Sequence, residues 1–169
     1  MKDEAIRFVI INIVADCFGL HPRNDIIILN LLEVSMIKIT DKPISPQVVI
    51  NKVRTSGSGC VVTYVGLIRD NSRGKPVLSV EYQDADGEAE ARLREIAEEI
   101  MRKFPVNNVA MYHRAGKLKV GDINLVVAIA AAHRTEGFAA SQYAVDRFKE
   151  KLPTTKIESY QDGSVWTGE

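Results

Sequence analysis

Hydrophobic residues recur along residues 36–169 with two periods, and each period predicts one kind of element. Short segments in which apolar residues alternate with polar ones, or run on continuously, predict strands, and apolar residues spaced three or four apart predict helices. We expect strands at residues 36–40, 60–68, 77–82, 109–113, 124–131, 156–160 and 164–166. The segment 124–131 is the most apolar of these, which predicts a central strand.

Three segments have helical features. Ser45 followed by Pro46 is typical of a helix start, with serine as N-cap and proline at the first position. Residues 87–104 place Leu93, Ile96 and Ile100 on one face and charged residues on the other, and Pro105 follows. A third helix is expected over residues 135–152, where Pro153 stops it.

The order of these elements predicts the fold class. Residues 69–76 are polar and predict an exposed loop, after which 77–82 is expected to return as the hairpin partner of 60–68. Asp162-Gly163 predicts a tight turn between the last two strands. Strands joined both by turns and by helices favour an α+β fold, with a largely antiparallel sheet and two long helices packed on it in a hammerhead-like arrangement.

Residues 1–35 differ from the rest of the chain. Their apolar runs, 8–14 and 26–32, are shorter than the ~20 residues of a membrane helix, and no signal peptide is recognisable. Two interpretations remain. The segment is an extension that packs on the domain or on a partner, or the start codon has been placed too far upstream and Met36 is the initiator. We therefore divide the chain into an extension, 1–35, and one domain, 36–169.

Composition excludes several classes of protein. Lys and Arg together number 22, and so do Asp and Glu, whereas a nucleic-acid-binding domain usually carries a basic excess. Two cysteines cannot form a disulfide framework and favour a reducing compartment, so we expect a cytoplasmic protein. The three histidines lack the spacing of a zinc site, and no phosphate-binding loop, dinucleotide-binding or serine-hydrolase motif is present.

Basic residues stand where predicted elements end. Arg69 follows one strand, and His133 and Arg134 lie between another strand and a helix, where free N–H groups, an imidazole and a guanidinium favour a phosphate. The alternative is that Arg134 only caps a loop or keeps it solvated, and that His133 forms a hydrogen bond with a buried carbonyl group.

Lys149 and Lys156 flank Pro153. Lysines beside other cations or apolar walls become nucleophiles or acid–base groups, although lysines near the end of a helix are also ordinary partners of its dipole. Cys60 in an apolar strand is more typical of an inert buried thiol than of a sulfur carrier. Trp166 is suited either to stacking on a heterocycle or to core packing.

Taken together, these segments resemble the large, catalytic subunit of molybdopterin synthase, over essentially residues 36–169. Each matching piece is short, and the specificity lies in their order and spacing. The pieces are Gly66-Leu67-Ile68-Arg69-Asp70, Gly74-Lys75-Pro76-Val77, Glu81-Tyr82, Tyr112-His113-Arg114-Ala115-Gly116, Val120-Gly121-Asp122, Ala132-His133-Arg134, Arg147-Phe148-Lys149, 153–156 and Asp162-Gly163-Ser164-Val165-Trp166.

The resemblance implies a sulfurtransferase. That family converts cyclic pyranopterin monophosphate into molybdopterin, with sulfur from the thiocarboxylated C-terminal glycine of a small ubiquitin-like subunit ending in Gly-Gly. Large subunits form a homodimer, each binding one small subunit, to give a heterotetramer. No cofactor or metal is expected, since substrate and partner supply phosphate and sulfur. By the same match, Lys149 and Lys156 are catalytic, and the substrate-binding positions are Leu67, Ile68, Arg69, His133, Arg134, Ile157 and Glu158.

The chain departs from the family pattern around the second lysine. Thr155 stands where a bulky aromatic residue is common, and Ile157 where a basic one is common. The wall of the pocket is therefore expected to differ. Two alternatives to the enzyme are a non-catalytic scaffold that keeps the partner site and a phosphometabolite-binding protein of the same fold.

Overall fold

The computed structural model of this chain describes residues 36–151 and 153–168. The extension or misplaced start that the sequence suggests, residues 1–35, lies outside the described residues. Among the described residues, no helix has both the length and the apolar character needed to cross a membrane.

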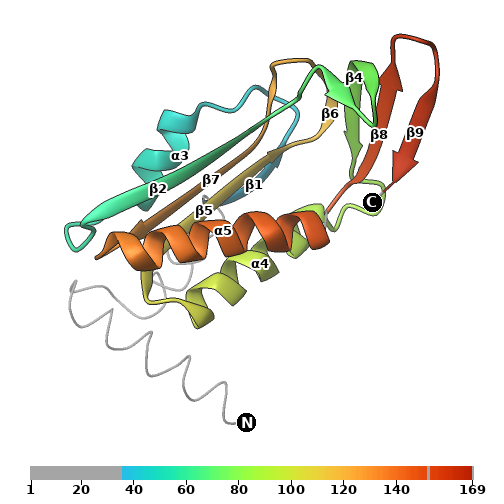
Figure 1. The fold of residues 1–169 in the computed structure, drawn as a ribbon. Helices are drawn as coiled ribbons and strands as arrows, with labels where there is room; N and C mark the ends of the chain where they lie inside the picture. The colour runs from blue at the N-terminus through green and yellow to red at the C-terminus, as the bar shows by residue number, and fades with distance from the viewer. Residues whose placement is uncertain (1–35, 152, 169) are drawn as a thin grey trace. The chain divides into compact units, whose positions relative to one another are not determined.

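A four-stranded sheet forms the centre of the domain (Figure 1). Its strands are ordered β1 (Ile37–Thr40), β5 (Val106–Arg114), β7 (Ile123–Ala131) and β2 (Cys60–Leu67). β1 runs parallel to β5, and the other pairs are antiparallel. β7 lies inside the sheet, with its residues from Leu125 to Ala131 buried, as its continuous apolar sequence predicts.

Helices cover both faces of this sheet. Alternate residues of β7 point to opposite faces and are apolar on both, so each face is covered by helices. Val127 and Ile129 pack with α4 (Ala89–Lys103) and α5 (Arg134–Glu150). Val126 and Ala128 pack instead with the shorter helix α3 (Pro46–Val53). Figure 1 shows α4 and α5 side by side along one face and α3 on the other.

A second, smaller sheet stands at one end of the first. It contains β3 (Asn71–Ser72), β4 (Lys75–Gln83), β8 (Thr155–Tyr160) and β9 (Val165–Gly168) in that order, and β6 (Gly116–Lys119) also pairs with β4. Its inner face has a core of its own, made of Ile68, Val77, Val80, Tyr82, Leu118 and Tyr160, with Trp166 packed against them.

The α+β class and the two long helices expected from the sequence are confirmed, and so is the closing hairpin, β8 with β9. One expected pairing is wrong. Residues 77–82 belong to β4, which pairs with β6 and β8, whereas β2 pairs with β7. The physical reason lies in the presumed loop 69–76, which forms its own tight hairpin. Arg73 and Gly74 both have positive φ there, 55° and 75°, and turn the chain into the second sheet.

Candidate functional site

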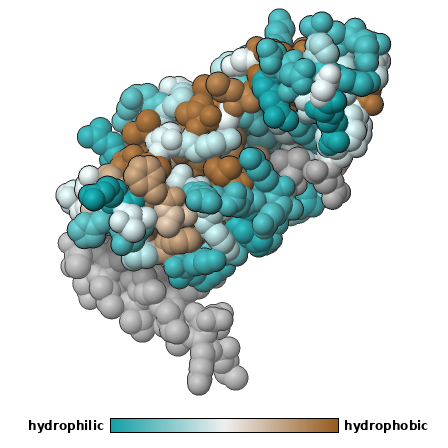
Figure 2. Space-filling view, viewed as in Figure 1, coloured by the Kyte–Doolittle hydropathy of each residue, from teal (hydrophilic) through white to brown (hydrophobic). Residues whose placement is uncertain are grey.

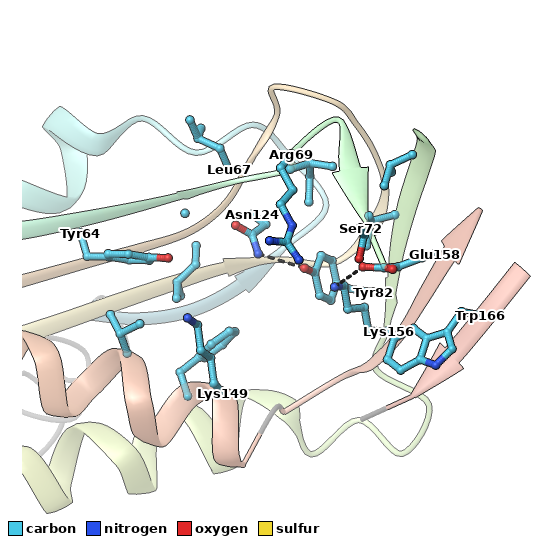
Figure 3. Close-up of a pocket in the computed structure, with 17 residues that line it drawn as sticks. Tyr64, Leu67, Arg69, Ser72, Tyr82, Asn124, Lys149, Lys156, Glu158 and Trp166 are labelled. Carbon is cyan, nitrogen blue, oxygen red and sulfur yellow. Dashed lines mark hydrogen bonds and ion pairs between the residues drawn. The ribbon is translucent and has the colours of Figure 1, made fainter. Parts of the chain in front are cut away.

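A cavity of about 440 Å³ opens where the two sheets meet the end of α5 (Figure 3). Six strands and one helix contribute to its walls. The lining residues are Tyr64, Gly66, Leu67, Ile68 and Arg69 from β2 and its end, Ser72 from β3, Val77, Val80 and Tyr82 from β4, Asn124 and Leu125 from β7, Val145, Phe148 and Lys149 from α5, and Lys156, Glu158 and Trp166 from β8 and β9.

Helix α5 presents Lys149 to this cavity. Val145, Phe148 and Lys149 are spaced three and four residues apart, so they share one face of the helix. Phe148 is 4 % exposed and packs into the core, which fixes the orientation of the last turn. The exposed ammonium of Lys149 forms no ion pair with any residue that the structure describes.

Arg69 enters the cavity from the opposite side. Ile68, just before it, is buried and donates its N–H to the carbonyl of Asp122 at 2.9 Å, while its own carbonyl accepts the N–H of Gly121 at 2.8 Å. These two bonds fix the backbone from which Arg69 projects. Figure 3 shows the side chains of Arg69 and Lys149 directed into the same space, and Arg69 also forms no ion pair within the described part of the chain.

Lys156 and Glu158 face the cavity from β8. Their side chains lie on one side of the strand, and Nζ of Lys156 is 2.5 Å from Oε1 of Glu158. The Tyr160 hydroxyl donates to the other carboxylate oxygen at 2.6 Å. Glu158 is only 2 % exposed. Burial raises the pKa of its carboxyl, but hydrogen bonds from Lys156, Tyr160 and Ser72 outweigh this, and the pKa lies below its usual value.

Tyr82 and Asn124 form the polar part of the floor. The amide nitrogen of Asn124 donates to the Tyr82 hydroxyl at 3.0 Å. Burial raises the pKa of Tyr82, so this phenol is neutral at physiological pH. The other polar atom of the amide, Oδ1 of Asn124, is buried and has no hydrogen-bond partner among residues 36–151 and 153–168. It lies beside Gly66, where a Cβ would come within 2.7 Å of it.

Beneath this floor lies His113, which is fully buried. Its Nδ1 is 2.8 Å from the carbonyl oxygen of Asn124, and its Nε2 is 2.9 Å from the hydroxyl of Thr154. Its ring meets those of Tyr82 and Phe148 edge-on. Burial lowers the pKa of His113 to about 4, so the imidazole is neutral at physiological pH.

Trp166 closes the cavity on the side of β9. The Arg73 guanidinium lies over its indole ring, 3.8 Å from the centroid, a distance that suits a cation–π contact. The ring also covers the backbone at Gly168, where an added Cβ would lie 2.3 Å from Cζ2 of the indole. Glycine at 168 therefore leaves room for the indole.

The structure brings together six of the nine predicted site residues. Leu67, Ile68, Arg69, Lys149, Lys156 and Glu158 all line the cavity. Ile157 does not, because it lies between two inward-facing residues of β8 and so points to the other side of the small sheet. His133 and Arg134 are exposed at the first turn of α5, whereas Lys149 is in its last turn. At a rise of 1.5 Å per residue, roughly 22 Å of helix separates Arg134 from Lys149.

Sequence reasoning missed several lining residues. Tyr64 and Asn124 carried no motif, and Tyr82 stood in a matching segment without an assigned role. The approach of these three residues depends on how β2, β4 and β7 pair. Trp166 was weighed as a lone aromatic and included in a matching segment, but it was not among the predicted site residues. Its register opposite Glu158 in the final hairpin would have placed it beside the predicted site. Cys60 lies at the other end of β2 from Arg69, does not line the cavity, and has its thiol 3.6 Å from the carbonyl oxygen of Ala131.

The charge of the cavity favours an anion. Its charged lining residues are Arg69, Lys149, Lys156 and the single carboxylate Glu158, and only Lys156 is paired with that carboxylate. Two cations thus remain uncompensated around a partly apolar space, an arrangement that binds phosphates and carboxylates. Within the described part of the chain, no three His, Cys, Asp or Glu side chains are grouped as metal ligands.

Comparison with known proteins gives a consistent result. The model of the MoaE protein family matches residues 39–151. A protein of Nostoc sp. named molybdopterin synthase catalytic subunit is 42% identical over 127 residues, which are 75% of this chain and 77% of that protein. The human protein of the same name is 35% identical over 133 residues, 79% of this chain and 71% of that protein.

Solved structures agree with the sequence comparisons. The crystal structure of molybdopterin synthase from Staphylococcus aureus superposes with a TM-score of 0.74 at 28% identity, over 79% of this chain and 97% of that one. A complex of subunits 1 and 2 of the molybdopterin-converting factor from Helicobacter pylori has a TM-score of 0.61 over 75% of this chain and 86% of that one. At 12% identity it shows the shared fold alone.

Proposed function

This chain belongs to the MoaE family of molybdopterin synthase catalytic subunits, sulfurtransferases of molybdenum cofactor biosynthesis, and we propose that its cavity is the place of sulfur transfer. The substrate is cyclic pyranopterin monophosphate, and the sulfur donor is a thiocarboxylate at the Gly-Gly end of a small ubiquitin-like subunit. The observation that carries the proposal is the convergence of Arg69, Lys149 and Lys156, from three separate elements, on one cavity.

Arg69 suits the phosphate of the substrate. A guanidinium binds phosphate oxygens through two parallel N–H donors, and Arg69 has no competing carboxylate among the described residues. Its backbone is anchored by the bonds of Ile68, so the charge is held in place before substrate arrives. Pre-orientation of this kind reduces the entropy lost on binding.

Lys149 suits the thiocarboxylate. The thiocarboxylate sulfur attacks a carbon of the pterin side chain, and an oxygen substituent leaves that carbon, so that a thioester joins the two molecules. Water then adds to the acyl carbon, negative charge develops on the acyl oxygen, and the bond between the acyl carbon and sulfur breaks. Sulfur stays on the pterin, and the small subunit leaves as a carboxylate. An uncompensated ammonium stabilises this developing charge. Lys156 differs because Glu158 holds it at 2.5 Å, which favours a fixed role in substrate binding or proton transfer.

A small-subunit partner is supported by the name of the relatives, since a catalytic subunit implies at least one further subunit. The Helicobacter pylori protein of the same fold is described as a complex of subunits 1 and 2. A tail that ends in two glycines has no side chains at its end, which suits entry into a cavity of about 440 Å³. The reducing compartment favoured by the cysteine content suits a thiocarboxylate, and we place the enzyme in the cytoplasm.

A homodimer accounts for His133 and Arg134. Because they lie at the far end of α5 from Lys149, they reach a cavity only if a second copy supplies them. A two-fold axis near the middle of α5 would bring Arg134 of each chain toward Lys149 of the other.

The surface there suits a dimer contact. β2 is the last strand of its sheet, so one edge is open, and Val65 and Leu67 on it are exposed. Phe138 on α5 is 63% exposed. Figure 2 shows apolar side chains gathered over β2 and the neighbouring part of α5, whereas the small sheet is largely hydrophilic.

The test is conversion of cyclic pyranopterin monophosphate by the purified chain with a thiocarboxylated small subunit, measured as molybdopterin formed. We expect Lys149→Ala to abolish product formation without changing the melting temperature, since the side chain is exposed. Lys149→Arg keeps the charge but alters reach, and should retain partial activity.

Lys151→Ala is the matched control. Lys151 is two residues away, approaches Glu99 at 3.8 Å and lies outside the cavity, so its loss should leave turnover unchanged. Normal product yield from Lys149→Ala would contradict the proposal. A scaffold or a simple phosphometabolite-binding protein would bind the small subunit or the precursor and form no product with the unaltered chain.

A further inference from the structure

Two hydrogen bonds formed by Pro153 and Thr154, in the connection between α5 and β8, hold it to the rest of the domain. This connection joins the two catalytic lysines of the proposed site, Lys149 and Lys156. The carbonyl of Pro153 accepts a hydrogen bond from Nη1 of Arg92 at 3.3 Å. The hydroxyl of Thr154, a residue only 3 % exposed, lies 2.9 Å from Nε2 of His113. The second of these contacts is buried and carries the argument.

The direction of that hydrogen bond follows from the other side of the ring. A carbonyl oxygen can only accept, so the contact of Nδ1 with the carbonyl of Asn124 requires Nδ1 to carry the proton. In a neutral imidazole Nε2 is then an acceptor, and the Thr154 hydroxyl donates to it. His113 thus links β5, on which it stands, to β7 and to the connection.

The same ring supports the cavity directly. Its centroid lies 4.8 Å from that of Tyr82 and 5.0 Å from that of Phe148, both in edge-on geometry. Tyr82 and Phe148 line the cavity, and Phe148 immediately precedes Lys149. Thr154 in turn comes two residues before Lys156. One side chain therefore contacts the chain next to each of the two lysines.

We propose that His113 is a positioning residue of the sulfur-transfer site, which sets the relative placement of Lys149 and Lys156 by holding Thr154 on one side and Phe148 on the other. This inference rests on the proposed function, because it assigns a role within that reaction. His113 does not touch substrate; it acts through the two elements that carry the lysines.

The expected effect is on turnover rather than on binding. If the Thr154 hydroxyl is lost, the start of β8 loses its buried anchor while Arg69 keeps its own backbone bonds. Misplacement of a reacting group by about 1 Å costs up to roughly a hundredfold in rate. We therefore expect kcat to fall about tenfold to a hundredfold, with little change in KM for the precursor.

Three substitutions test this. Thr154→Val removes the hydroxyl at nearly constant volume, and Thr154→Ser keeps it. Thr155→Val makes the same chemical change one residue later. Contrary to the expectation from the sequence, Thr155 does not line the cavity, and its side chain forms no hydrogen bond with the described residues. His113→Phe is less informative, since it removes both ring contacts at once and risks unfolding.

Two readouts are needed. The first is kcat and KM for molybdopterin formation with the thiocarboxylated partner. The second, independent of catalysis, is hydrogen exchange of the Thr155 and Lys156 amides in the full chain, which should become about tenfold faster in Thr154→Val alone. Thr154→Ser and Thr155→Val should resemble the unaltered protein in both.

The outcomes separate this inference from the proposed function. Unchanged turnover in Thr154→Val, or unchanged exchange at the start of β8, would overturn the role of His113 and leave the sulfur-transfer assignment standing. If the unaltered chain forms no product, the proposed function fails, and the exchange measurement alone decides whether His113 holds the connection.

Discussion

Lys156 and Glu158 form an ion pair along a single strand, with 2.5 Å between Nζ and Oε1, although one residue separates them in the sequence. The strand geometry makes this contact, because residues two apart project from the same face. The carboxylate is nearly inaccessible and also accepts a hydrogen bond from Tyr160. A buried acid that binds three donors holds the lysine in a fixed place.

Glu158→Gln should destabilise the protein and alter its response to acid. Replacing a charged acceptor by a neutral one costs about 1–3 kcal/mol in the free energy of unfolding at pH 7. The folded-state pKa of Glu158 is lowered, so its contribution is complete above the ordinary pKa of 4.5 and is lost as the pH falls through the lower folded value. The free energy of unfolding, measured with urea at pH 7 and pH 3, should therefore fall less in the variant than in the unaltered protein as the pH drops below 4.5.

The matched control for that substitution is Glu81→Gln. Glu81 lies on β4, and its carboxylate accepts a hydrogen bond from Gln83 at an exposed position. Its replacement should change the free energy of unfolding by less than about 0.5 kcal/mol. Equal effects of the two substitutions would show that burial of Glu158 has no energetic consequence.

His113 should make the protein sensitive to pH in a different range. Burial lowers its pKa from 6.5 to about 4, so the unfolded chain takes up a proton that the folded chain does not. The contribution of His113 to the free energy of unfolding is fully present above pH 6.5. It is lost as the pH falls from 6.5 to 4, which lowers the free energy of unfolding by roughly 3 kcal/mol. We expect His113→Gln to be less stable at pH 7 but to lack this decline.

Unfolding of both proteins by urea between pH 7 and pH 4 measures the difference. His133→Gln is the control, since that ring is exposed at the start of α5 and its loss should leave the decline in place. Parallel pH curves for the unaltered protein and His113→Gln would exclude a neutral, buried imidazole.

Subunit complementation tests the shared site. Lys149→Ala and Arg134→Ala should each be inactive as pure proteins. If each cavity combines Lys149 of one chain with Arg134 of the other, a mixed dimer has one intact cavity and one carrying both changes. Random mixing of subunits should then restore about a quarter of the activity. No recovery after unfolding and refolding the mixture would place both residues in one chain's site or outside it.

Gly168→Ala should displace the indole of Trp166. A Cβ at this position would lie 2.3 Å from the ring, and the chain contains a single tryptophan, so its fluorescence reports on the cavity wall. We expect a shift of the emission maximum and a loss of about 1–3 kcal/mol in stability. Gly57→Ala serves as control, because its Cβ would meet nothing closer than 3.8 Å. Unchanged emission in Gly168→Ala would show that the ring has another position available.

The sequence predicted the elements well because their signals are local. Pro46 and Pro105 mark the start of one helix and the end of another, and the apolar run of β7 identifies an inner strand. It misassigned the partner of β4 because strand pairing depends on residues far apart. The positive φ of Arg73 was the deciding feature there, and an arginine gives no warning of it.

The candidate site was predictable in part for the same reason. Arg69, Lys149 and Lys156 were found by resemblance and by their positions at element ends, and the fold then brought them together. His113 was noted only as part of a matching segment. Its importance arises from contacts with Thr154 and Phe148, 41 and 35 residues away, which no spacing along the chain could indicate.

The cavity has walls from both sheets, and this has a consequence for the protein's dynamics. Arg69 follows a strand of the large sheet, whereas Lys156 and Trp166 belong to the small one. A bound phosphate ester that contacts both groups acts as a clamp between the sheets. Substrate binding and the rigidity of the small sheet are thus thermodynamically linked. A change that loosens the small sheet weakens substrate binding, and bound substrate makes the small sheet more rigid.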